Sequence, residues 1–578
     1  MTPSHPLRLA ARLIGLGLCL CLLPPLTQAT PFELSGTVRL DPPSPVAGAI
    51  VTLTDAQGAA ESTYTDMQGK WHLRTGDLKA PVQLRVRAGA AYADALPALP
   101  EAGQPVDVIL HRLTSDKEVS ERLTASAHAS AIRWQNASTK QDFIGQCHFC
   151  HQIGNAWTRK PKTEREWHDT IKRMEGYGAL ITWQNESDFT AALTDSFDGR
   201  PVKAVQTLAM HPDLPQAKMR EWAFGGPINY VHDVELGDDG KIYGADMSAD
   251  MIWILDPRTN QLESVQLPPN GLPLGGQFSG SVAPLGTFAA YHGPHSIVKG
   301  PDGKMYLTCS LSAEIAIFDP RTRQTEFIPT GRGTVYPHTL RFDKQGALWF
   351  TLALSNQVAR MDVRTKHIEL MSLPSHGFWR WVSDQMLPTV LTVSSWFGKK
   401  DMQVALSHHQ ITGQGHQILN LPYGLDVNPV DGSIWYSKLY AGYIGRIDPL
   451  TREIKEFKTP FAGPRRLRFD QNGVLWIPSF EEGMLMKFDT KAQTFVKSYR
   501  LPLLAANEYE TPYALAIQPE TQQVWIAANM SDRMLRFDPK TETFAAYPSP
   551  TRVAVPPAWV YQPMARLQNR LGARSFNM

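Results

Sequence analysis

The sequence predicts a multidomain, mainly β protein: a small N-terminal β-sandwich, a small α-helical domain, and a C-terminal β-propeller of six or seven blades. Three observations support this prediction. Apolar and polar residues alternate in short stretches near the N-terminus, apolar residues then recur three and four positions apart, and a unit of several strands repeats along the C-terminal half. The length of 578 residues agrees, because domains of roughly 150 residues give three or four units.

The repeated unit occupies residues 221–547 and consists of a strand, a glycine turn, a second strand and a third strand that ends in aspartate. Five copies have sixteen residues from the turn glycine to the aspartate: Gly240–Asp256, Gly303–Asp319, Gly346–Asp362, Gly432–Asp448 and Gly473–Asp489. A sixth copy ends at Asp538 without the glycine. This regularity predicts radial blades of four antiparallel strands. The longest interval, between the third and fourth copies, could hold a seventh blade within 375–420 or an inserted loop containing FWRWVSDQM.

Segments of the type GPxGI, GPDGxLWFT and IGRID recur in the same region. With them, the region resembles the virginiamycin B lyase and streptogramin lyase family of propellers over about 320 residues. The resemblance implies the propeller fold, in agreement with the repeats.

Residues 30–114 alternate apolar and polar positions in stretches such as GAIVTLTD and VQLRVRA, with turn residues between them. They predict a small β-sandwich. The run from Ser35 to Arg74 resembles the carboxypeptidase regulatory-like family, whose members fold as transthyretin-like sandwiches and usually act as accessory modules. This resemblance implies no catalytic role.

Residues 1–29 have the pattern of a secretory signal. Arg8 and Arg12 precede an apolar stretch, Leu13 to Leu23, that is too short to span a bilayer comfortably, and small residues follow up to Ala29. We therefore expect cleavage after Ala29 and a periplasmic or secreted protein. A retained membrane anchor is the alternative.

Charge, cysteine content and apolar stretches limit the classes of partner that we expect. The formal charge of +2 comes from 57 basic and 55 acidic residues without long runs of one sign, so we expect no nucleic-acid partner. The mature chain would keep three cysteines, Cys147, Cys150 and Cys309, which do not make a disulfide framework. The nearest other apolar stretch, residues 378–397, is interrupted by charges and a proline, so we expect no membrane span after signal removal. Residues 548–578 form a C-terminal tail.

Residues 115–200 form the predicted helical domain and contain the segment Cys147-His148-Phe149-Cys150-His151. This is the attachment sequence of c-type haem, in which the two thiols bond to the vinyl groups and the adjacent histidine binds iron. A Cys-x-x-Cys pair can also bind zinc or act as a redox dithiol, but zinc needs two further Cys or His ligands and a dithiol site needs a βαβ setting. We therefore expect one covalent haem c, held by Cys147, Cys150 and His151, and predict a small cytochrome c-like haem domain.

The sixth iron ligand is expected on a later helix. Trp167, Ile171, Met174 and Gly178 recur at spacings of four, three and four and so share one helix face. The sequence resembles small cytochrome c domains with a Trp and then a Met seven residues later, which implies that Met174 is the distal ligand. A Met on a helix face can instead fill the core. His168 is the rival ligand, but its position should project it away from that stripe.

A second set of candidates lies eight residues before each turn glycine, where the innermost strand of each blade begins. The residues at this position are His232, His295, His338 and Arg465, with Tyr423 and Tyr513 where the turn differs in length. Three neutral imidazoles facing one channel could bind a divalent transition metal. Alternatively, they could hydrogen-bond to neighbouring blades.

Fourteen residues after each histidine lie Asp246, Cys309 and Leu352. In the lyase family, a His and a Glu at corresponding positions act with magnesium to eliminate across an ester-linked ring. No Glu occupies this column, which argues against streptogramin lyase activity, although Asp246 could act as a base or a metal ligand. Cys309 could also be a fourth metal ligand. The other histidines, His408, His409 and His416, are expected in loops.

Taken together, these features predict an exported c-type cytochrome fused to a β-propeller. We expect an oxidoreductase or electron-transfer protein that passes electrons from a small-molecule substrate in the propeller channel, through haem c, to a periplasmic electron-transfer partner. His232, Asp246, His295, His338 and Arg465 are the candidate catalytic residues. A metal-dependent lyase-like enzyme and a non-catalytic binding module remain open, because propellers host all three functions.

Overall fold

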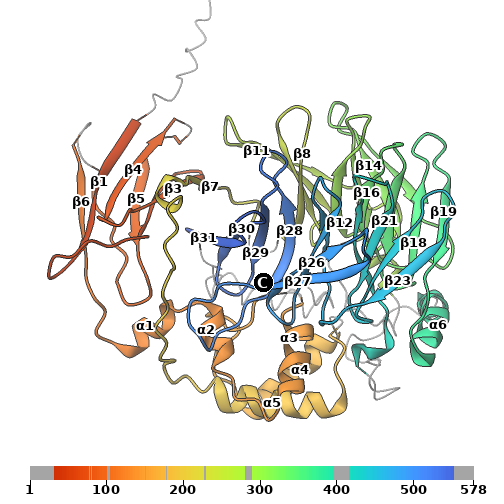
Figure 1. The fold of residues 1–578 in the computed structure, drawn as a ribbon, viewed down its shortest axis with the longest axis horizontal. Helices are drawn as coiled ribbons and strands as arrows, with labels where there is room; N and C mark the ends of the chain where they lie inside the picture. Colours follow the sequence, from red (N-terminus) through yellow and green to blue (C-terminus); the bar gives the residue numbers. More distant parts are fainter. Residues whose placement is uncertain are drawn as a thin grey trace, which may run out of the picture.

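The computed structural model describes residues 32–551, except 77, 80, 100–103, 150, 177–178, 227–228, 280–289 and 396–414. It contains two sheets at the N-terminal end, a group of helices, and a ring of four-stranded sheets (Figure 1). We call these parts the two-sheet unit, the helical unit and the propeller. The helical unit lies below the ring, and the two-sheet unit stands beside it.

The two-sheet unit is formed by six strands that precede the helical unit in the sequence and by one strand that follows it. Its strands are β1 (Phe32–Leu40), β2 (Ile50–Asp55), β3 (Ala60–Tyr64), β4 (Lys70–Thr75), β5 (Val82–Arg87), β6 (Val106–Leu110) and β7 (Met219–Glu221). The sheets have the orders β4-β1-β6 and β5-β2-β3-β7. Their apolar residues share one core, which includes Val38, Leu53 and Val86. The expected alternation is clearest in β4, where every second residue is buried.

The helical unit contains five helices: α1 (Asp116–Arg122), α2 (Ala125–Ser130), α3 (Ala137–Cys147), α4 (Glu164–Gly176) and α5 (Trp183–Ser196). Ser115, Asn136 and Thr182 cap α1, α3 and α5, since each side chain accepts a hydrogen bond from the first turn. Phe143 of α3, Ile171 of α4 and Phe189 of α5 meet in one apolar cluster. This packing fixes the end of α3, where the cysteine motif begins.

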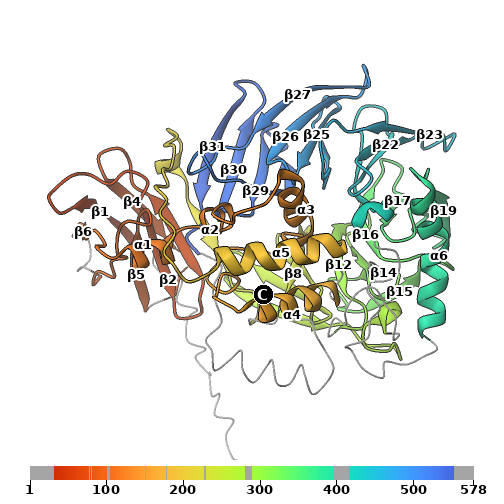
Figure 2. The same ribbon diagram turned by 90° about the horizontal axis from the view of Figure 1, so that it is seen from below.

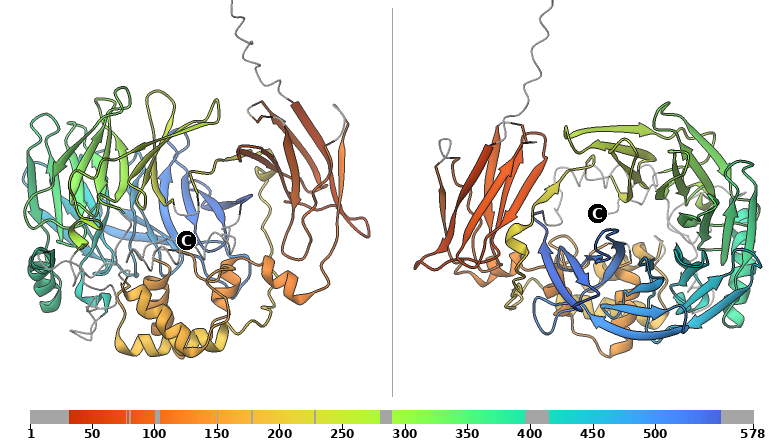
Figure 3. Two further views of the ribbon diagram at one scale, coloured as in Figure 1. Left: turned by 180° about the vertical axis from the view of Figure 1, so that it is seen from behind. Right: turned by 45° about the horizontal axis from the view of Figure 1, so that its top comes forward.

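The propeller contains six four-stranded antiparallel sheets among the described residues. The blades are β8–β11 (Val231–Leu236, Ile242–Asp246, Met251–Asp256, Gln261–Gln266), β12–β15 (Pro294–Lys299, Met305–Cys309, Glu314–Phe318, Thr325–Pro329), β16–β19 (Pro337–Phe342, Leu348–Leu352, Gln357–Met361, Ile368–Ser372), β20–β23 (Pro422–Val427, Ile434–Lys438, Tyr443–Ile447, Ile454–Lys458), β24–β27 (Arg468–Phe469, Val474–Ser479, Met484–Asp489, Thr494–Arg500) and β28–β31 (Pro512–Ile517, Val524–Ala528, Arg533–Asp538, Thr543–Pro548). We number them blades one to six. From blade one to blade six, each blade contacts the next through their first strands, which therefore line the axis (Figure 3).

The repeated glycines have a conformational role. Gly240, Gly303, Gly346, Gly432 and Gly473 all have φ between 73° and 79°, the left-handed region that other residues rarely adopt. Each glycine lies in the turn between the first and second strands of its blade. The repeat found in the sequence is therefore the repeat of this turn.

The expected seventh blade is not found in the described part of 375–420, which contains helix α6 (Phe378–Ser395) and a short 3-10 helix (His416–Ile418). Polar contacts fix α6 to the propeller: Asp384 accepts hydrogen bonds from Asn356 and Asn420, both at 2.8 Å. Its opposite face exposes Phe378, Trp379, Trp381 and Met386. The long interval is thus an insertion between blades three and four.

The two-sheet unit contacts the first and last blades from outside the ring (Figure 3). The Tyr64 hydroxyl donates to Pro548 O at 2.6 Å, at the end of blade six. The Trp222 indole donates to Asn260 Oδ1 at 2.8 Å, on blade one. In the part of the chain that the structure describes, no helix has both the length and the apolar character needed to cross a bilayer.

Candidate functional site

The six residues predicted to border the channel meet around the propeller axis. The imidazole centroids of His232 and His295 are 3.6 Å apart, and those of His295 and His338 are 4.1 Å apart. The His338 ring lies 3.9 Å from the Tyr423 ring, and the hydroxyls of Tyr423 and Tyr513 are 2.9 Å apart. The Tyr513 hydroxyl closes the circle at 3.2 Å from His232 Nε2. The sixth member, Arg465, packs against both tyrosine rings. We call these six residues the axial ring.

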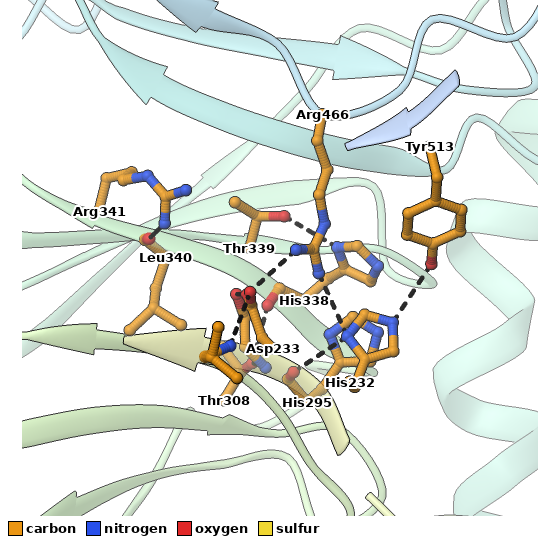
Figure 4. A network of polar contacts seen from close by, with 12 residues as sticks. His232, Asp233, His295, Thr308, His338, Thr339, Leu340, Arg341, Arg466 and Tyr513 are labelled. Atoms are coloured by element: carbon orange, nitrogen blue, oxygen red, sulfur yellow. Dashed lines mark hydrogen bonds and ion pairs between the residues drawn. The ribbon is translucent and has the colours of Figure 1, made fainter. Parts of the chain in front are cut away.

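Two histidines of the axial ring, His232 and His338, contact neighbouring blades through hydrogen bonds, whereas His295 Nδ1 is buried with no hydrogen-bond partner among the described residues (Figure 4). His232 Nδ1 lies 3.1 Å from His295 O and 3.3 Å from Arg466 Nη2, and its Nε2 lies 3.2 Å from the Tyr513 hydroxyl. His338 Nδ1 lies 3.1 Å from Tyr423 O. These contacts match the alternative in which the histidines join the blades.

Electrostatics keep these imidazoles neutral. Burial, followed by the nearby Arg466 guanidinium, lowers the pKa of His232 to about 3. Burial likewise lowers the pKa of His295 and of His338 well below the ordinary value. Neutral imidazoles can bind metals, but no three His, Cys, Asp or Glu side chains among the described residues are arranged to hold an ion. The predicted metal site at His232, His295 and His338 therefore gains no support from their geometry.

Asp246, a candidate catalytic residue, is the last residue of β9. Its side chain is fully buried in blade one and accepts hydrogen bonds at 2.7–3.2 Å from Asn229, Tyr230, Ser248, Ala249 and Trp253. The other two members of its column, Cys309 and Leu352, lie in the apolar cores of blades two and three. All three residues are the last residue of the second strand of their blade.

We predict that Asp246→Ala lowers the free energy of unfolding by about 3 kcal/mol or more, because several buried donors lose their acceptor. Asp246→Asn keeps one carbonyl oxygen and should cost less. Urea unfolding of both variants measures the effect. Unchanged stability together with a loss of turnover would instead restore Asp246 as a catalytic base.

The predicted haem-attachment segment lies against the axial ring. Cys147 is the last residue of α3, and His148 and Phe149 form the turn that follows. The Phe149 ring lies 5.9 Å from the Tyr423 ring, and the guanidinium carbon of Arg465 lies 4.7 Å from the Phe149 ring centre. His148 Nε2 lies 2.7 Å from the Tyr509 hydroxyl, just before blade six. Figure 2 shows the molecule from below, with α3 and α5 in front of the propeller.

Further contacts fix the helical unit to the propeller. The Ser126 hydroxyl donates to Tyr509 O at 2.6 Å, and the Gln152 amide donates to Asn529 O at 2.8 Å. On the other side, His416 N donates to Leu180 O at 3.1 Å. The attachment segment is therefore held at the channel by contacts with blade six and with the insertion before blade four.

The chemistry of the donor set fits a covalent haem. His151 Nδ1 faces Gln152 O at 3.4 Å, which leaves Nε2 as the nitrogen available to iron. Burial lowers the pKa of His151, so the imidazole is neutral, as a ligand must be. Cys147 packs against the apolar cluster that includes Trp167 and Ile171. Cys150 lies outside the described residues.

The second predicted iron ligand, Met174, is half-buried near the end of α4. Trp167 and Ile171, on the same predicted stripe, are buried, whereas Gly178 lies outside the described residues. The His168 side chain is 49 % exposed, and its Nε2 lies 2.9 Å from a Glu186 carboxylate oxygen on α5. His168 thus faces α5 and solvent, and ligation by Met174 stays a prediction.

Sequence reasoning missed the residues that connect the helical unit to the channel, chiefly Phe149, Tyr509 and Glu481. Glu481 lies over Gly145 of α3, where an added Cβ would come within 2.8 Å of its Oε1. Burial raises the pKa of Glu481 to about 7, although Arg465 opposes this. No sequence pattern indicates these contacts, since each joins residues more than 250 positions apart. Among the loop histidines, His416 is half-buried, and His408 and His409 lie outside the described residues.

Glu481 predicts a pH dependence of stability. The folded chain binds this proton more tightly than the unfolded chain, so the stability that depends on it is lost as the pH rises from about 4.5 through about 7. Relative to Glu481→Gln, the wild-type free energy of unfolding should fall by on the order of 2 kcal/mol between pH 5 and 8. Denaturant titrations across this range measure the difference. Parallel curves for the two proteins would contradict the assignment.

Comparison with known proteins gives only distant structural likenesses. No protein-family model and no curated protein matches the chain. Among solved structures, virginiamycin B lyase from Staphylococcus aureus is 14% identical with a TM-score of 0.42, covering 57% of this chain and 86% of its own. Hydrazine synthase from Kuenenia stuttgartiensis is 15% identical with a TM-score of 0.37, covering 53% and 76%.

Proposed function

We propose that the protein is an exported c-type cytochrome that oxidises a small molecule at the propeller axis and passes the electrons to a periplasmic electron-transfer partner. The observation that carries this proposal is the position of the attachment segment. Phe149, between the two cysteines, contacts Tyr423 and Arg465 of the axial ring. A substrate at the axis would therefore lie next to the haem-bearing loop.

In this proposal Cys147, Cys150 and His151 hold haem c, with Met174 as the distal ligand, and the helical unit is the cytochrome domain. Haem c supplies a one-electron redox centre. The chain itself excludes water from the axis, since Arg465, His295 and His338 are almost completely buried. Tyr423, Tyr513 and His232 form a hydrogen-bonded row that can orient a polar group of the substrate. The two-sheet unit would be the transthyretin-like accessory sandwich.

The lyase-like alternative finds less support. It needs a base or a metal ligand at the positions fourteen residues after the axial histidines. One of these is Asp246, whose carboxylate already accepts hydrogen bonds within its own blade. Cys309 and Leu352 of the same column are buried in blade cores. A haem group also has no use in a simple elimination. A non-catalytic binding module would show no reduction of the haem by any donor.

The test uses the mature chain produced in a host that attaches haem. Alcohols, phenols and amines are offered as electron donors, and haem reduction is followed by absorption. At least one donor should reduce the haem, and His295→Ala should slow this by about a hundredfold, because a misplaced substrate loses its orientation. His367→Ala is the matched control, since this histidine is exposed on the outer side of blade three. Equal reduction rates in His295→Ala and His367→Ala would refute the proposal. Failure of every donor to reduce the haem of the unsubstituted protein would also refute it.

A further inference from the structure

The Arg465 side chain is fully buried, and none of its three guanidinium nitrogens has a hydrogen-bond acceptor among the described residues. Its backbone is well fixed: Arg465 N donates to Pro478 O at 3.2 Å, and Arg465 O accepts from the Ser437 hydroxyl at 2.7 Å. The backbone of Arg465 is therefore held in place, while the five N–H donors of its guanidinium have no acceptor among the described residues. Buried donors in proteins are almost always paired.

Four aromatic rings surround this guanidinium. Its carbon lies 3.6 Å from the ring centre of Phe480, 4.5 Å from Tyr513, 4.7 Å from Phe149 and 5.5 Å from Tyr423. The rings come from blades four to six and from the attachment segment. Ring faces stabilise a cation, but they do not accept the in-plane hydrogen bonds that a guanidinium offers.

No carboxylate in the described part of the chain lies at hydrogen-bonding distance from the Arg465 guanidinium either. The adjacent Arg466 donates to the Asp233 carboxylate at 3.0 Å, so that pair is internally balanced. Glu481 is close enough to act electrostatically on Arg465, but it reaches none of the guanidinium nitrogens. The site therefore offers one positive charge and a planar fork of donors in an apolar surrounding.

We propose that Arg465 binds the carboxylate of a small organic monoanion at the propeller axis. A carboxylate matches the guanidinium fork in two parallel hydrogen bonds, and its single charge equals the one left unbalanced. The aromatic rings suit the apolar remainder of such a molecule. The identification of this anion as the substrate rests on the proposed function, whereas its binding does not.

Calorimetric titration of the haem-loaded mature protein with acetate and benzoate tests this proposal, with acetamide and benzamide as uncharged analogues. We expect one saturable site for at least one carboxylate and none for either amide. Arg465→Gln should weaken binding at least thirtyfold, and Arg465→Lys should weaken it less, because the charge is kept and the fork is lost. Arg536→Gln, which removes a guanidinium paired with Asp213 at the outside of blade six, is the matched control and should bind normally.

A haem propionate is a second source of the same carboxylate chemistry. If it occupies Arg465, the loaded protein will not bind added carboxylates, the haem-free Cys147→Ser/Cys150→Ser protein will bind them, and Arg465→Gln will shift the reduction potential. Binding to neither protein, or equal binding by Arg465→Gln, overturns the proposal. Carboxylate binding without donor-driven haem reduction would instead retain this site and reject the proposed function.

Discussion

The Cys147→Ser/Cys150→Ser variant is expected to lose all covalently bound haem, while its propeller remains folded. In the proposed function the two thiols are the attachment points, and without thioether bonds the porphyrin would be extracted by acidified acetone. The measurement is the pyridine haemochrome spectrum of the extracted polypeptide. Donor-driven absorption changes should disappear with the haem. The propeller should survive because its blade cores are separate from the attachment segment.

Cys309→Ala is the matched control for this experiment. Its thiol is completely buried in the core of blade two, where burial raises its pKa well above the ordinary value and keeps it unreactive. This variant should retain one haem per chain, with only a loss of stability. Haem retained in the double serine variant, or lost in Cys309→Ala, would contradict the assignment of the attachment site.

Met174→Ala is expected to change the iron from six- to five-coordinate. The absorption band of the Met–iron bond should vanish, and the reduction potential should fall by on the order of 100 mV or more, because Met ligation raises the potential of cytochromes. Absorption spectra and a redox titration of the mature protein measure both effects.

His168→Ala serves as the comparison for Met174→Ala. His168 contacts Glu186 and is half-exposed, so its loss should leave both the spectrum and the potential unchanged. The reverse pattern, with Met174→Ala spectrally silent and His168→Ala altered, would assign the distal position to the histidine.

The propeller could be predicted because its repeat has a local cause. A turn that requires positive φ selects glycine at one position of each blade, and the strand spacing follows from it. Counting back from the turn glycine also indicated which residues gather at the axis, because the first strands line it. The insertion between blades three and four was harder to interpret. Helix α6, with its exposed aromatic residues, has no counterpart between the other blades among the residues that the structure describes.

The parts of the site that sequence could not give depend on contacts between distant segments. Phe149 meets Tyr423, and His148 meets Tyr509, only because the helical unit lies across the end of the propeller. Strand β7 likewise joins the sheet of β3 across more than 150 residues. Asp246 shows the opposite problem. Its spacing from His232 resembles that of a lyase pair. Spacing alone does not reveal that its carboxylate oxygens accept hydrogen bonds from groups of its own blade.

The proposed position of a haem next to the axial ring can be tested with 3-fluorotyrosine placed at Tyr423 and, as a control, at Tyr243, which is buried in the apolar cluster between blades one and two. Ferric low-spin iron is paramagnetic and ferrous low-spin iron is not. Fluorine NMR of the mature protein should therefore show a Tyr423 signal that shifts and sharpens on reduction, and a Tyr243 signal that changes far less. Equal behaviour of the two signals would contradict a haem at the propeller axis.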